Sequence, residues 1–532
     1  MPTGDEIYTI ALQLGRAGRR DDAIRWLEDH AADIVSHAAA LGLMGTLLAM
    51  NERPKAALAH FEQSVALDGS RAVIHSDMGV ALTKLNRADE ALASFDRALA
   101  LDPGDVQALN NRSHHWLELR EGELALADAE RALALRPRLM PAHRQRSRAL
   151  LLLHRWDDAL RSIDEALVLD PRNAENHAVR GEILDAAGRR EEAVEAFDRA
   201  VDLQDVGENH AYGRGLGHLR HHAFAAGWAD YEHRWRDANF VRTTWRHDRE
   251  LLRRREAEPK DVAGRRVLLL GEQGVGDEIM FASMIPDLAA VAAKVVCVTN
   301  PRLRALFQAS FPQVDFATDT RTMDLSAFDR IVPSGSLGAL FRNAMEEFPG
   351  APYLTPRPHA VARWMNRLGS RTTPLRVGLS WRGGVFSTGA NGRSLDLSAL
   401  APLLERADCE FVSLQHGDVA AEIDAVNATL ARPLRRFEPA ELDEFESLAG
   451  LVRALDVIVS VQTALVHLAG AVGTPCLAMI PFFPEWRYGQ GVSTMPWYGG
   501  VELFRQPRHG AWPPVLEAIG AALDRRSRLA SN

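Results

Sequence analysis

The sequence predicts a multidomain protein in which an all-α helical-repeat solenoid is followed by a pair of α/β lobes of the Rossmann type. Three observations predict this. Alanine recurs at a fixed spacing through the first half, and from Arg266 onward short apolar runs alternate with helical patterns. In the stretch DVIVSVQTALVHLAGAVGTPCLAMIP, residues 456–481, a strand pattern changes to a helix pattern with almost no loop. A chain of 532 residues also exceeds what one core supports, so two or three domains are expected.

Composition excludes several classes of protein. A formal net charge of −9 argues against a nucleic-acid binder that works by neutralising phosphates. The three cysteines, Cys297, Cys409 and Cys476, lie in apolar runs without metal-type spacing, so we expect buried, reduced thiols and a cytoplasmic protein. The chain shows no signal-peptide pattern and no run of roughly eighteen apolar residues. We therefore expect neither secretion nor a membrane span.

The first half has a period of 34 residues, the period of tetratricopeptide repeats. Independent columns of glycine or serine, of aromatic residues and of proline keep the same phase. We therefore predict about seven helix pairs over residues 4–241, a segment that resembles tetratricopeptide-repeat domains. The alanines that define the period are Ala23, Ala57, Ala91, Ala125, Ala159 and Ala193.

A solenoid of this kind presents a concave groove, formed by the first helix of each pair, that usually takes an extended polypeptide. Any single polar residue on these helices could equally be an ordinary solvated side chain. The residues that we predict to face the groove are Asn110, Asn111, His114, Arg144, Gln145 and Arg148.

Residues 242–264 are rich in charge and lack apolar periodicity, so we predict a connector there. Strand patterns at 267–270, 295–298 and 330–332 predict a first lobe, residues 265–355. Those at 377–380, 411–414, 457–461 and 477–480 predict a second, residues 375–532, with a hinge near 352–375. Two such lobes would face each other across a cleft, where ligands bind at the carboxyl ends of strands.

The first strand of the first lobe leads into GEQGVGDEIMFASMIPDL. The order of Gly271, Gly274 and Gly276 differs from the G-x-G-x-x-G fingerprint, which argues against a nicotinamide or flavin site. There is no G-x-x-x-x-G-K-[ST] motif either, so a P-loop is not expected. The turn places Asp277 at the start of a helix and at the mouth of the cleft. Asp277 could also be an ordinary helix N-cap.

In the second lobe, the turn Gln462-Thr463 separates the strand at 457–461 from a helix. Such a turn presents the first N–H groups of the helix beyond the end of a parallel strand, a place that suits an anionic ligand. Taken alone, the pattern also fits an ordinary connection between a strand and a helix.

Together GVGDEIMFASMIP and SVQTALVHLAGAVGTP resemble the paired signatures of heptosyltransferase-like GT-B glycosyltransferases. The resemblance extends from Arg266 to about Arg505 and includes GLSWRGG, NGRSLDL, FVSLQHG and PEWRYG. The same arrangement is seen in bacterial proteins that fuse tetratricopeptide repeats to such a domain, some of which modify flagellin. The eukaryotic O-linked N-acetylglucosamine transferases are similar in overall plan. The resemblance implies a nucleotide-activated sugar as donor substrate, with no cofactor and no metal.

The resemblance also implies roles for individual residues. Asp277 matches the position proposed as the general base, which takes the proton of the acceptor hydroxyl. Thr463 and Ala464 match the turn that holds the donor phosphates, and His467 matches a histidine near them, although it could be a core histidine. The other residues that we expect at the donor site are Gly274, Gly276, Trp381, Arg382, Arg393, Gln415 and Gln462.

Gln462 stands where the family usually has aspartate. The loss of a negative charge indicates either a different sugar, such as an acidic one that a carboxylate would repel, or a lost activity. The chain has no D-x-D motif, so arginines and a helix dipole would have to neutralise the phosphates.

Three functions remain open from the sequence. The first is an inverting glycosyltransferase that O-glycosylates a protein acceptor recruited by the repeat groove, with flagellin as the first candidate. The second is a repeat scaffold that carries a catalytically inactive glycosyltransferase-like module. The third is transfer onto lipopolysaccharide or another glycan, which would leave the repeats unexplained.

Overall fold

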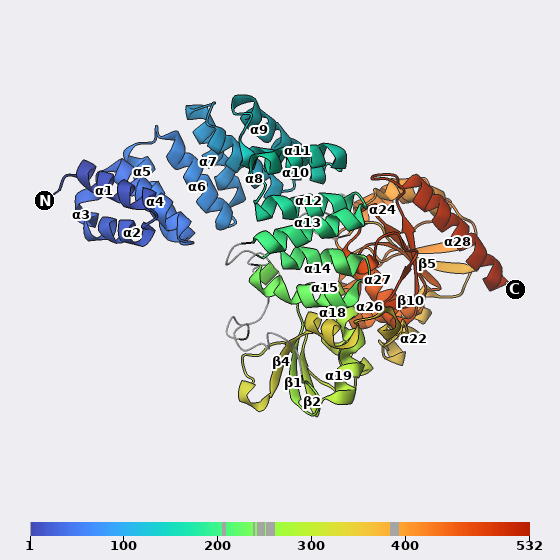
Figure 1. The fold of residues 1–532 in the computed structure, drawn as a ribbon. Coiled ribbons are helices and arrows are strands. Elements are labelled where there is room, and N and C mark those ends of the chain that lie inside the picture. Colours follow the sequence, from blue (N-terminus) through green and yellow to red (C-terminus); the bar gives the residue numbers. More distant parts are fainter. Residues whose placement is uncertain are drawn as a thin grey trace. The chain divides into compact units, whose positions relative to one another are not determined.

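The computed structural model describes residues 2–204, 209–237, 240–241, 251, 261–383 and 393–531. The chain divides into two compact units, residues 1–187 and 188–532. Figure 1 shows the helical first unit in blue and blue-green, and the mixed α/β architecture of the second in green to red. Within the described residues, none of the helices combines the length and the apolar character that crossing a bilayer requires.

The first unit consists of helices that pack in consecutive pairs, such as α4 with α5 and α8 with α9. Of the alanines that define the period, the five in this unit lie in the second helices of their pairs and are fully buried: Ala23, Ala57, Ala91, Ala125 and Ala159. The helices are α1 (Gly4–Arg16), α2 (Arg20–Asp29), α3 (Ala31–Ile34), α4 (Ala38–Met50), α5 (Pro54–Leu67), α6 (Ala72–Lys84), α7 (Ala88–Leu101), α8 (Val106–Glu118), α9 (Gly122–Leu135), α10 (Met140–Leu152), α11 (Trp156–Leu169) and α12 (Ala174–Ala186).

Glycine and aromatic residues of the sequence columns pack against each other in the pairs α4–α5 and α6–α7. A Cβ atom at Gly45 would lie 2.5 Å from the Phe61 ring, and one at Gly79 would lie 2.6 Å from the Phe95 ring. The small residue is therefore needed because the aromatic ring of the second helix fills the space beside it. This packing explains why glycine and phenylalanine keep the same phase in these two pairs.

The second unit begins with the remaining helices of the repeat region, α13 (Arg190–Leu203), α14 (Ala211–Arg220) and α15 (Phe224–Tyr231). Helix α15 packs on α21 (Gly338–Phe341) of the first sheet region. The division between the units falls at residue 187, inside the predicted repeat segment 4–241. The physical reason is that the last repeat helices share a core with the α/β region. Most of the predicted connector, residues 242–250 and 252–260, lies outside the described residues.

The first sheet has four parallel strands in the order β3-β2-β1-β4. Strand β1 leads directly to α18, so the start of α18 lies at the carboxyl end of a central strand. The elements are β1 (Arg266–Leu270), α18 (Val275–Phe281), α19 (Ile285–Val291), β2 (Lys294–Val298), α20 (Arg304–Ser310), β3 (Asp315–Ala317) and β4 (Arg330–Pro333).

The second sheet has the order β6-β5-β7-β8-β10-β9, with β9 antiparallel to β10 and the other pairs parallel. Its elements are α22 (Pro358–Leu368), β5 (Leu375–Ser380), α23 (Ala401–Leu404), β6 (Cys409–Ser413), α24 (Ala420–Asn427), α25 (Pro439–Leu442), α26 (Phe445–Arg453), β7 (Val457–Val461), α27 (Ala464–Val472), β8 (Cys476–Ile480), β9 (Thr494–Met495), β10 (Tyr498–Arg505) and α28 (Pro513–Ser531).

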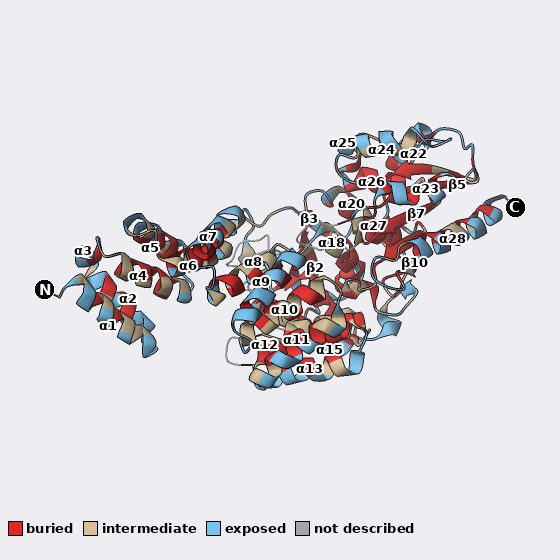
Figure 2. Ribbon diagram, turned by 90° about the horizontal axis from the view of Figure 1, so that it is seen from above, coloured by how far each residue is buried: buried red, intermediate tan, exposed pale blue. Residues whose placement is uncertain are grey.

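Both faces of this sheet are covered, as the buried strands in Figure 2 show. On β7, Val457 and Val459 pack in the cluster that includes residues of α28, whereas Ile458 between them belongs to the cluster that includes α26 and α27. This alternation, with apolar residues on both sides, explains why the strand appears in the sequence as one continuous apolar run.

All seven strands predicted from the sequence are present, each within two residues of its expected ends. The short edge strands β3 and β9 and the longer strand β10 were not predicted. The segment predicted as a hinge contains α22, which packs on α26, so part of it belongs to the second sheet region.

Candidate functional site

A cavity of about 190 Å³ lies where the first turns of α18 and α27 meet. The two helices approach closely because residue 276 is glycine. A Cβ atom there would lie 3.3 Å from both the Ala464 Cα and the His467 Cδ2. The cavity therefore draws on both sheet regions. Its lining residues are Gly276, Asp277, Arg393, Gln462, Thr463, Ala464, His467, Arg487 and Tyr488.

Asp277 is in the first turn of α18, three residues after the N-cap Gly274. Its carboxylate accepts a hydrogen bond from the Gly274 N–H, with 3.3 Å between the heavy atoms. Asp277 is therefore at the N3 position and satisfies the N–H of the N-cap, whereas the N-cap itself, the alternative role that the sequence allowed for Asp277, is Gly274. The carboxylate also forms an ion pair with Arg487, so it serves both the helix end and the cavity.

Arg487 was not predicted as a site residue. It lies in the 3₁₀ helix η9 (Trp486–Tyr488), which follows β8, and its side chain is only 14% exposed. Burial alone would lower its pKa, but the carboxylates of Asp277 and Glu485 more than offset this and raise the pKa above its ordinary value. Arg487 is therefore a permanent cation in the cavity wall. One feature of the sequence could have indicated Arg487: like Thr463, it follows a buried parallel strand, and ligands bind beyond the carboxyl ends of such strands.

The start of α27 is formed as the sequence predicts. Thr463 is the N-cap, and its hydroxyl oxygen accepts a hydrogen bond from the Leu465 N–H at 3.2 Å. No described residue accepts a hydrogen bond from the Ala464 N–H, and Ala464 lines the cavity. An anion in the cavity would therefore meet the positive end of a helix dipole.

Gln462 is 3% exposed and lines the cavity beside Thr463. Its side-chain Nε2 makes no hydrogen bond to any described residue. A buried amide donor without a partner costs free energy unless a ligand or water accepts from it. The amide is therefore available to a hydrogen-bond acceptor on a bound molecule.

His467 is buried and makes two hydrogen bonds to tyrosine hydroxyls. Its Nδ1 lies 3.2 Å from the Tyr498 Oη, and its Nε2 lies 3.4 Å from the Tyr488 Oη. Burial, and secondarily the positive charge of Arg487, lowers the pKa of His467 well below its ordinary value of 6.5. The imidazole is therefore neutral at pH 7. It lines the cavity, and both of its ring nitrogens are hydrogen-bonded, as expected for the core histidine that the sequence left open.

Arg393 lines the cavity with a side chain that is 11% exposed, and one guanidinium nitrogen lies 3.5 Å from a Glu485 oxygen. The same carboxylate lies 3.7 Å from Arg487. Glu485 thus holds both arginines beside the cavity. The two arginines thus balance the carboxylates of Asp277 and Glu485, and the arginines are the groups that an anion in the cavity would meet.

Four predicted donor-site residues do not line this cavity. Gly274 is the N-cap of α18, and Trp381 is buried in the core of the second sheet region. The Arg382 side chain is 46% exposed and forms an ion pair with Glu422 at 2.7 Å. The Gln415 amide is consumed by backbone contacts. Its oxygen accepts from the N–H groups of Trp381 and Arg382, and its nitrogen donates to the Arg382 carbonyl. Gln415 therefore holds the turn after β5 together and has no atom left over to recognise a base or ribose.

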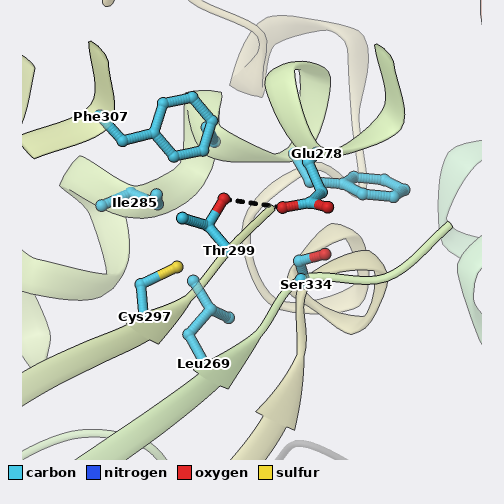
Figure 3. A pocket seen from close by; sticks show the side chains of 10 residues that line it. Leu269, Glu278, Ile285, Cys297, Thr299, Phe307 and Ser334 are labelled. Carbon is cyan, nitrogen blue, oxygen red and sulfur yellow. Dashed lines mark hydrogen bonds between the residues drawn. The ribbon is translucent and has the colours of Figure 1, made fainter. Parts of the chain in front are cut away.

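Glu278 follows Asp277 but lines a second cavity, of about 10 Å³. Its carboxylate accepts a hydrogen bond from the Thr299 hydroxyl (Figure 3), and the two oxygens are 2.7 Å apart. The Asn300 N–H also donates to it, at 3.0 Å. A space of this size holds at most one water molecule. Glu278 therefore anchors α18 to the end of β2 and so fixes the position of Asp277.

The predicted groove residues lie on α8 and α10, which are first helices of their pairs. Asn110 and Gln145 are only 7% exposed, so they offer little surface to a polypeptide. His114 is exposed, and Asn111 donates to Ser76 of α6. Arg144 and Arg148 both pair with Glu175 of α12, at 2.8 and 3.5 Å. These residues bridge neighbouring first helices, and among them His114 is exposed, the Arg148 side chain is 33% exposed and the Arg144 side chain is only 16% exposed.

Two segments of the repeat region match a known protein family. Models of the tetratricopeptide repeat match residues 48–111 and 144–207. The helix pairs within these two segments are tetratricopeptide repeats. Their period, their buried alanines and their glycine–aromatic contacts all agree with this assignment.

The chain is also similar to the protein FlbA of Caulobacter vibrioides. The two are 29% identical over 283 residues, which is 50% of this chain and 47% of FlbA. The chain therefore spans about half the length of this relative.

Several solved structures of tetratricopeptide-repeat proteins are similar to parts of the chain. PilW, a type IV pilus biogenesis factor, is 22% identical, with 37% of this chain and 91% of PilW covered and a TM-score of 0.35. A tetratricopeptide-repeat protein from Parabacteroides merdae is 16% identical, with 47% and 96% covered and a TM-score of 0.38. One from Thermus thermophilus is 22% identical, with 34% and 99% covered and a TM-score of 0.32.

Proposed function

We propose that the chain is an inverting glycosyltransferase of the GT-B type that transfers a sugar from a nucleotide donor to a hydroxyl of a protein. The observation that carries this proposal is the meeting of Asp277 with the start of α27 and two arginines at one cavity. A carboxylate and an anion site at the carboxyl ends of two parallel sheets provide a base and a leaving-group site.

In the proposed reaction, Asp277 accepts the proton of the acceptor hydroxyl while the hydroxyl oxygen attacks the anomeric carbon. A new carbon–oxygen bond forms as the bond between the sugar and the phosphate breaks, and the bonding electrons leave with the nucleotide. Arg487, Arg393 and the Ala464 N–H stabilise the negative charge that develops on the phosphate. Attack from the face opposite the phosphate inverts the anomeric carbon.

The ion pair between Asp277 and Arg487 has to separate for this reaction. A phosphate that binds at the start of α27 competes for the Arg487 guanidinium, because both anions prefer the same planar donors. Donor binding would then release the carboxylate to act as a base. A cavity of about 190 Å³ is below the roughly 300–1,000 Å³ of pockets for whole drug-sized ligands, so it suits the phosphate and sugar end of the donor.

The tetratricopeptide repeats support a protein as the acceptor, because helical repeats present surfaces that bind polypeptides. His114 and the Arg144, Arg148 and Glu175 cluster provide polar groups on the first helices for this purpose. Flagellin is our first candidate for the acceptor, on the resemblance to fused bacterial proteins alone.

The same ion pair favours a second candidate function, a repeat scaffold with a catalytically inactive module. A carboxylate that remains bound to a buried arginine cannot accept a proton. Gln462, in place of the usual aspartate, adds to this alternative. Under this function the repeats bind a partner and no sugar is transferred.

The test is nucleotide release from a panel of nucleotide sugars by the purified chain, with and without candidate acceptor proteins. We expect release with one donor, a matching mass increase of the acceptor, and loss of both in Asp277→Asn, which keeps the hydrogen bond to Gly274 but cannot take the proton. The scaffold function predicts no release with any donor, together with a partner complex that is lost when the repeats are deleted.

A further inference from the structure

Five groups form one hydrogen-bonded chain from the cavity to the backbone of α18. The Tyr488 hydroxyl contacts His467 Nε2 at 3.4 Å, and His467 Nδ1 contacts the Tyr498 hydroxyl at 3.2 Å. The Tyr498 hydroxyl contacts the Tyr353 hydroxyl at 3.3 Å, and the Tyr353 hydroxyl donates to the Ile279 carbonyl at 2.6 Å. We call this chain the tyrosine–histidine relay.

The carbonyl at the end of the relay fixes the direction of every hydrogen bond in it. The Ile279 oxygen can only accept, so the single hydroxyl proton of Tyr353 is used there. Tyr498 must then donate to Tyr353. Its own proton is thereby used, so the contact with His467 requires Nδ1 to be the protonated nitrogen.

The neutral imidazole therefore has its lone pair on Nε2, and the Tyr488 hydroxyl must donate to it. Burial keeps His467 neutral, as its lowered pKa indicates, and burial likewise raises the pKa of Tyr488, which stays a neutral phenol. Having spent its only proton on His467, the Tyr488 oxygen can act only as an acceptor toward a further group.

The relay is held in place by close packing. Gly470 of α27 lies against Tyr498, and a Cβ atom at Gly470 would lie 2.3 Å from the Tyr498 Cγ. Tyr498 is 0% exposed and Tyr488 is 2% exposed. Tyr353 is partly buried and packs against the same core. Water cannot easily enter to reverse the order of donors and acceptors.

We propose that the Tyr488 oxygen is a substrate-orienting acceptor that takes a hydroxyl or N–H group of the bound substrate. This inference rests on the proposed function. The cavity lining then offers hydrogen-bond donors, from Arg487, Arg393, Gln462 and the Ala464 N–H, and hydrogen-bond acceptors, from Asp277 and Tyr488. A ligand that carries a phosphate next to hydroxyl groups, such as a sugar phosphate, matches both sets of groups.

The polarity of the relay gives a prediction that a merely structural role for the tyrosines does not. In Tyr353→Phe, Tyr498 loses its acceptor and is free to donate to His467 Nδ1. The imidazole proton would move to Nε2 and donate to Tyr488, whose own proton would then be free to turn toward the cavity. A substitution outside the cavity would thus turn an acceptor in its wall into a donor.

The first measurement is the ¹⁵N NMR spectrum of the histidine side chains in the full chain, with the His467 signals identified by their loss in His467→Gln. We expect protonated Nδ1 in the wild type and in the control Tyr8→Phe, and a shift toward protonated Nε2 in Tyr353→Phe. Protonated Nε2 in the wild type, or an unchanged spectrum in Tyr353→Phe, would overturn the inference.

The second measurement is calorimetric titration with glycerol 1-phosphate and with propyl phosphate, which share a phosphate but differ in hydroxyl groups. We expect the wild type to bind glycerol 1-phosphate roughly threefold to tenfold more tightly, the size of one hydrogen bond, and Tyr488→Phe to lose this preference. Binding of both probes without a preference in the wild type, or an unchanged preference in Tyr488→Phe, would remove only the Tyr488 acceptor. Binding of neither probe would remove the anion site of the proposed function, and the Tyr488 acceptor with it.

Discussion

Arg487 and Asp277 form an ion pair that joins the loop after β8 of the second sheet to the first turn of α18 in the first. Their side chains are 14% and 16% exposed, so the contact is largely shielded from water. Breaking a buried pair by removing one partner leaves an uncompensated charge. The Arg487 guanidinium therefore stays paired with the Asp277 carboxylate until another anion in the cavity replaces that carboxylate.

The first prediction concerns the cation of this pair. Arg487→Met should weaken the binding of a nucleotide by about tenfold or more, because it removes a charge-assisted donor from the anion site. Isothermal titration with the nucleotide of the active donor measures this. Arg382→Met is the matched control, since Arg382 pairs with Glu422 outside the cavity lining, and its affinity should remain near that of the wild type. Equal losses in both variants would remove Arg487 from the site.

The second prediction concerns the absence of a negative charge at position 462, where the side chain is the neutral amide of Gln462. Gln462→Glu places a carboxylate at a 3% exposed position beside the start of α27, where it repels a phosphate. Nucleotide affinity should fall by about tenfold, and the loss should shrink as the pH is lowered and the new carboxylate is protonated. Gln462→Met, which removes the amide without adding charge, should cost less. An affinity that is unaffected by the added carboxylate would place the phosphate elsewhere.

The third prediction concerns the close approach of α18 and α27 at Gly276. Gly276→Ala adds a Cβ atom 3.3 Å from Ala464 and His467, so the helices must move apart. We expect a loss of about 1–3 kcal/mol in the free energy of unfolding, as in other overpacked sites, and weaker nucleotide binding. Gly500→Ala is the control, because no atom lies within 4 Å of its added Cβ. Urea denaturation would compare the two, and a Gly276→Ala variant as stable as the control would contradict the close packing.

The fourth prediction is a pH dependence from His467. Its pKa in the folded chain lies well below 6.5, so below about pH 6.5 the unfolded chain takes up a proton that the folded chain refuses. Stability should therefore be fully present above pH 6.5 and should fall on acidification, by up to ~1.4 kcal/mol per pH unit from this group. The difference in urea midpoint between pH 7 and pH 5 should be smaller in His467→Gln. Identical differences in the two proteins would show that His467 takes up its proton in the folded state.

The fifth prediction concerns the last repeat. Trp228 of α15 is 1% exposed, packs on Gly338, and donates through Nε1 to the Arg342 carbonyl at 2.8 Å. Trp228→Ala should destabilise the second unit by about 3–5 kcal/mol, and Trp228→Phe by clearly less. Limited proteolysis should then cut between α15 and β1 more quickly. Wild-type resistance in Trp228→Ala would mean that the last repeat is not anchored to the α/β region through this residue.

Much of the fold could be predicted because it follows from short-range patterns. The 34-residue period reflects contacts such as Gly45 with Phe61 and, one period later, Gly79 with Phe95. The strands of both sheets are buried on two faces and so appear as continuous apolar runs. The Thr463 cap and the position of Asp277 follow from the rule that helices begin beyond the carboxyl ends of parallel strands.

What could not be predicted depends on contacts between distant segments. Arg487 is in a short loop without periodicity, and only the fold brings it to Asp277, 210 residues earlier. Asn110 and Gln145 are polar in the sequence but are buried between helices. Gln415 follows a strand, as a ligand-binding residue would, yet its amide satisfies the turn after β5. The division at residue 187 depends on the packing of α15 on the first sheet region, which no local pattern reveals.

The most direct test of the account is a crystal structure of the full chain grown with UDP, GDP, ADP or CMP, whichever binds most tightly in titration. We expect the phosphates to bind at the first turn of α27, in contact with the Ala464 N–H and Arg487. We also expect the Asp277 carboxylate to be released from its ion pair with Arg487. Phosphates bound away from α27, or no binding of any of the four nucleotides, would contradict it.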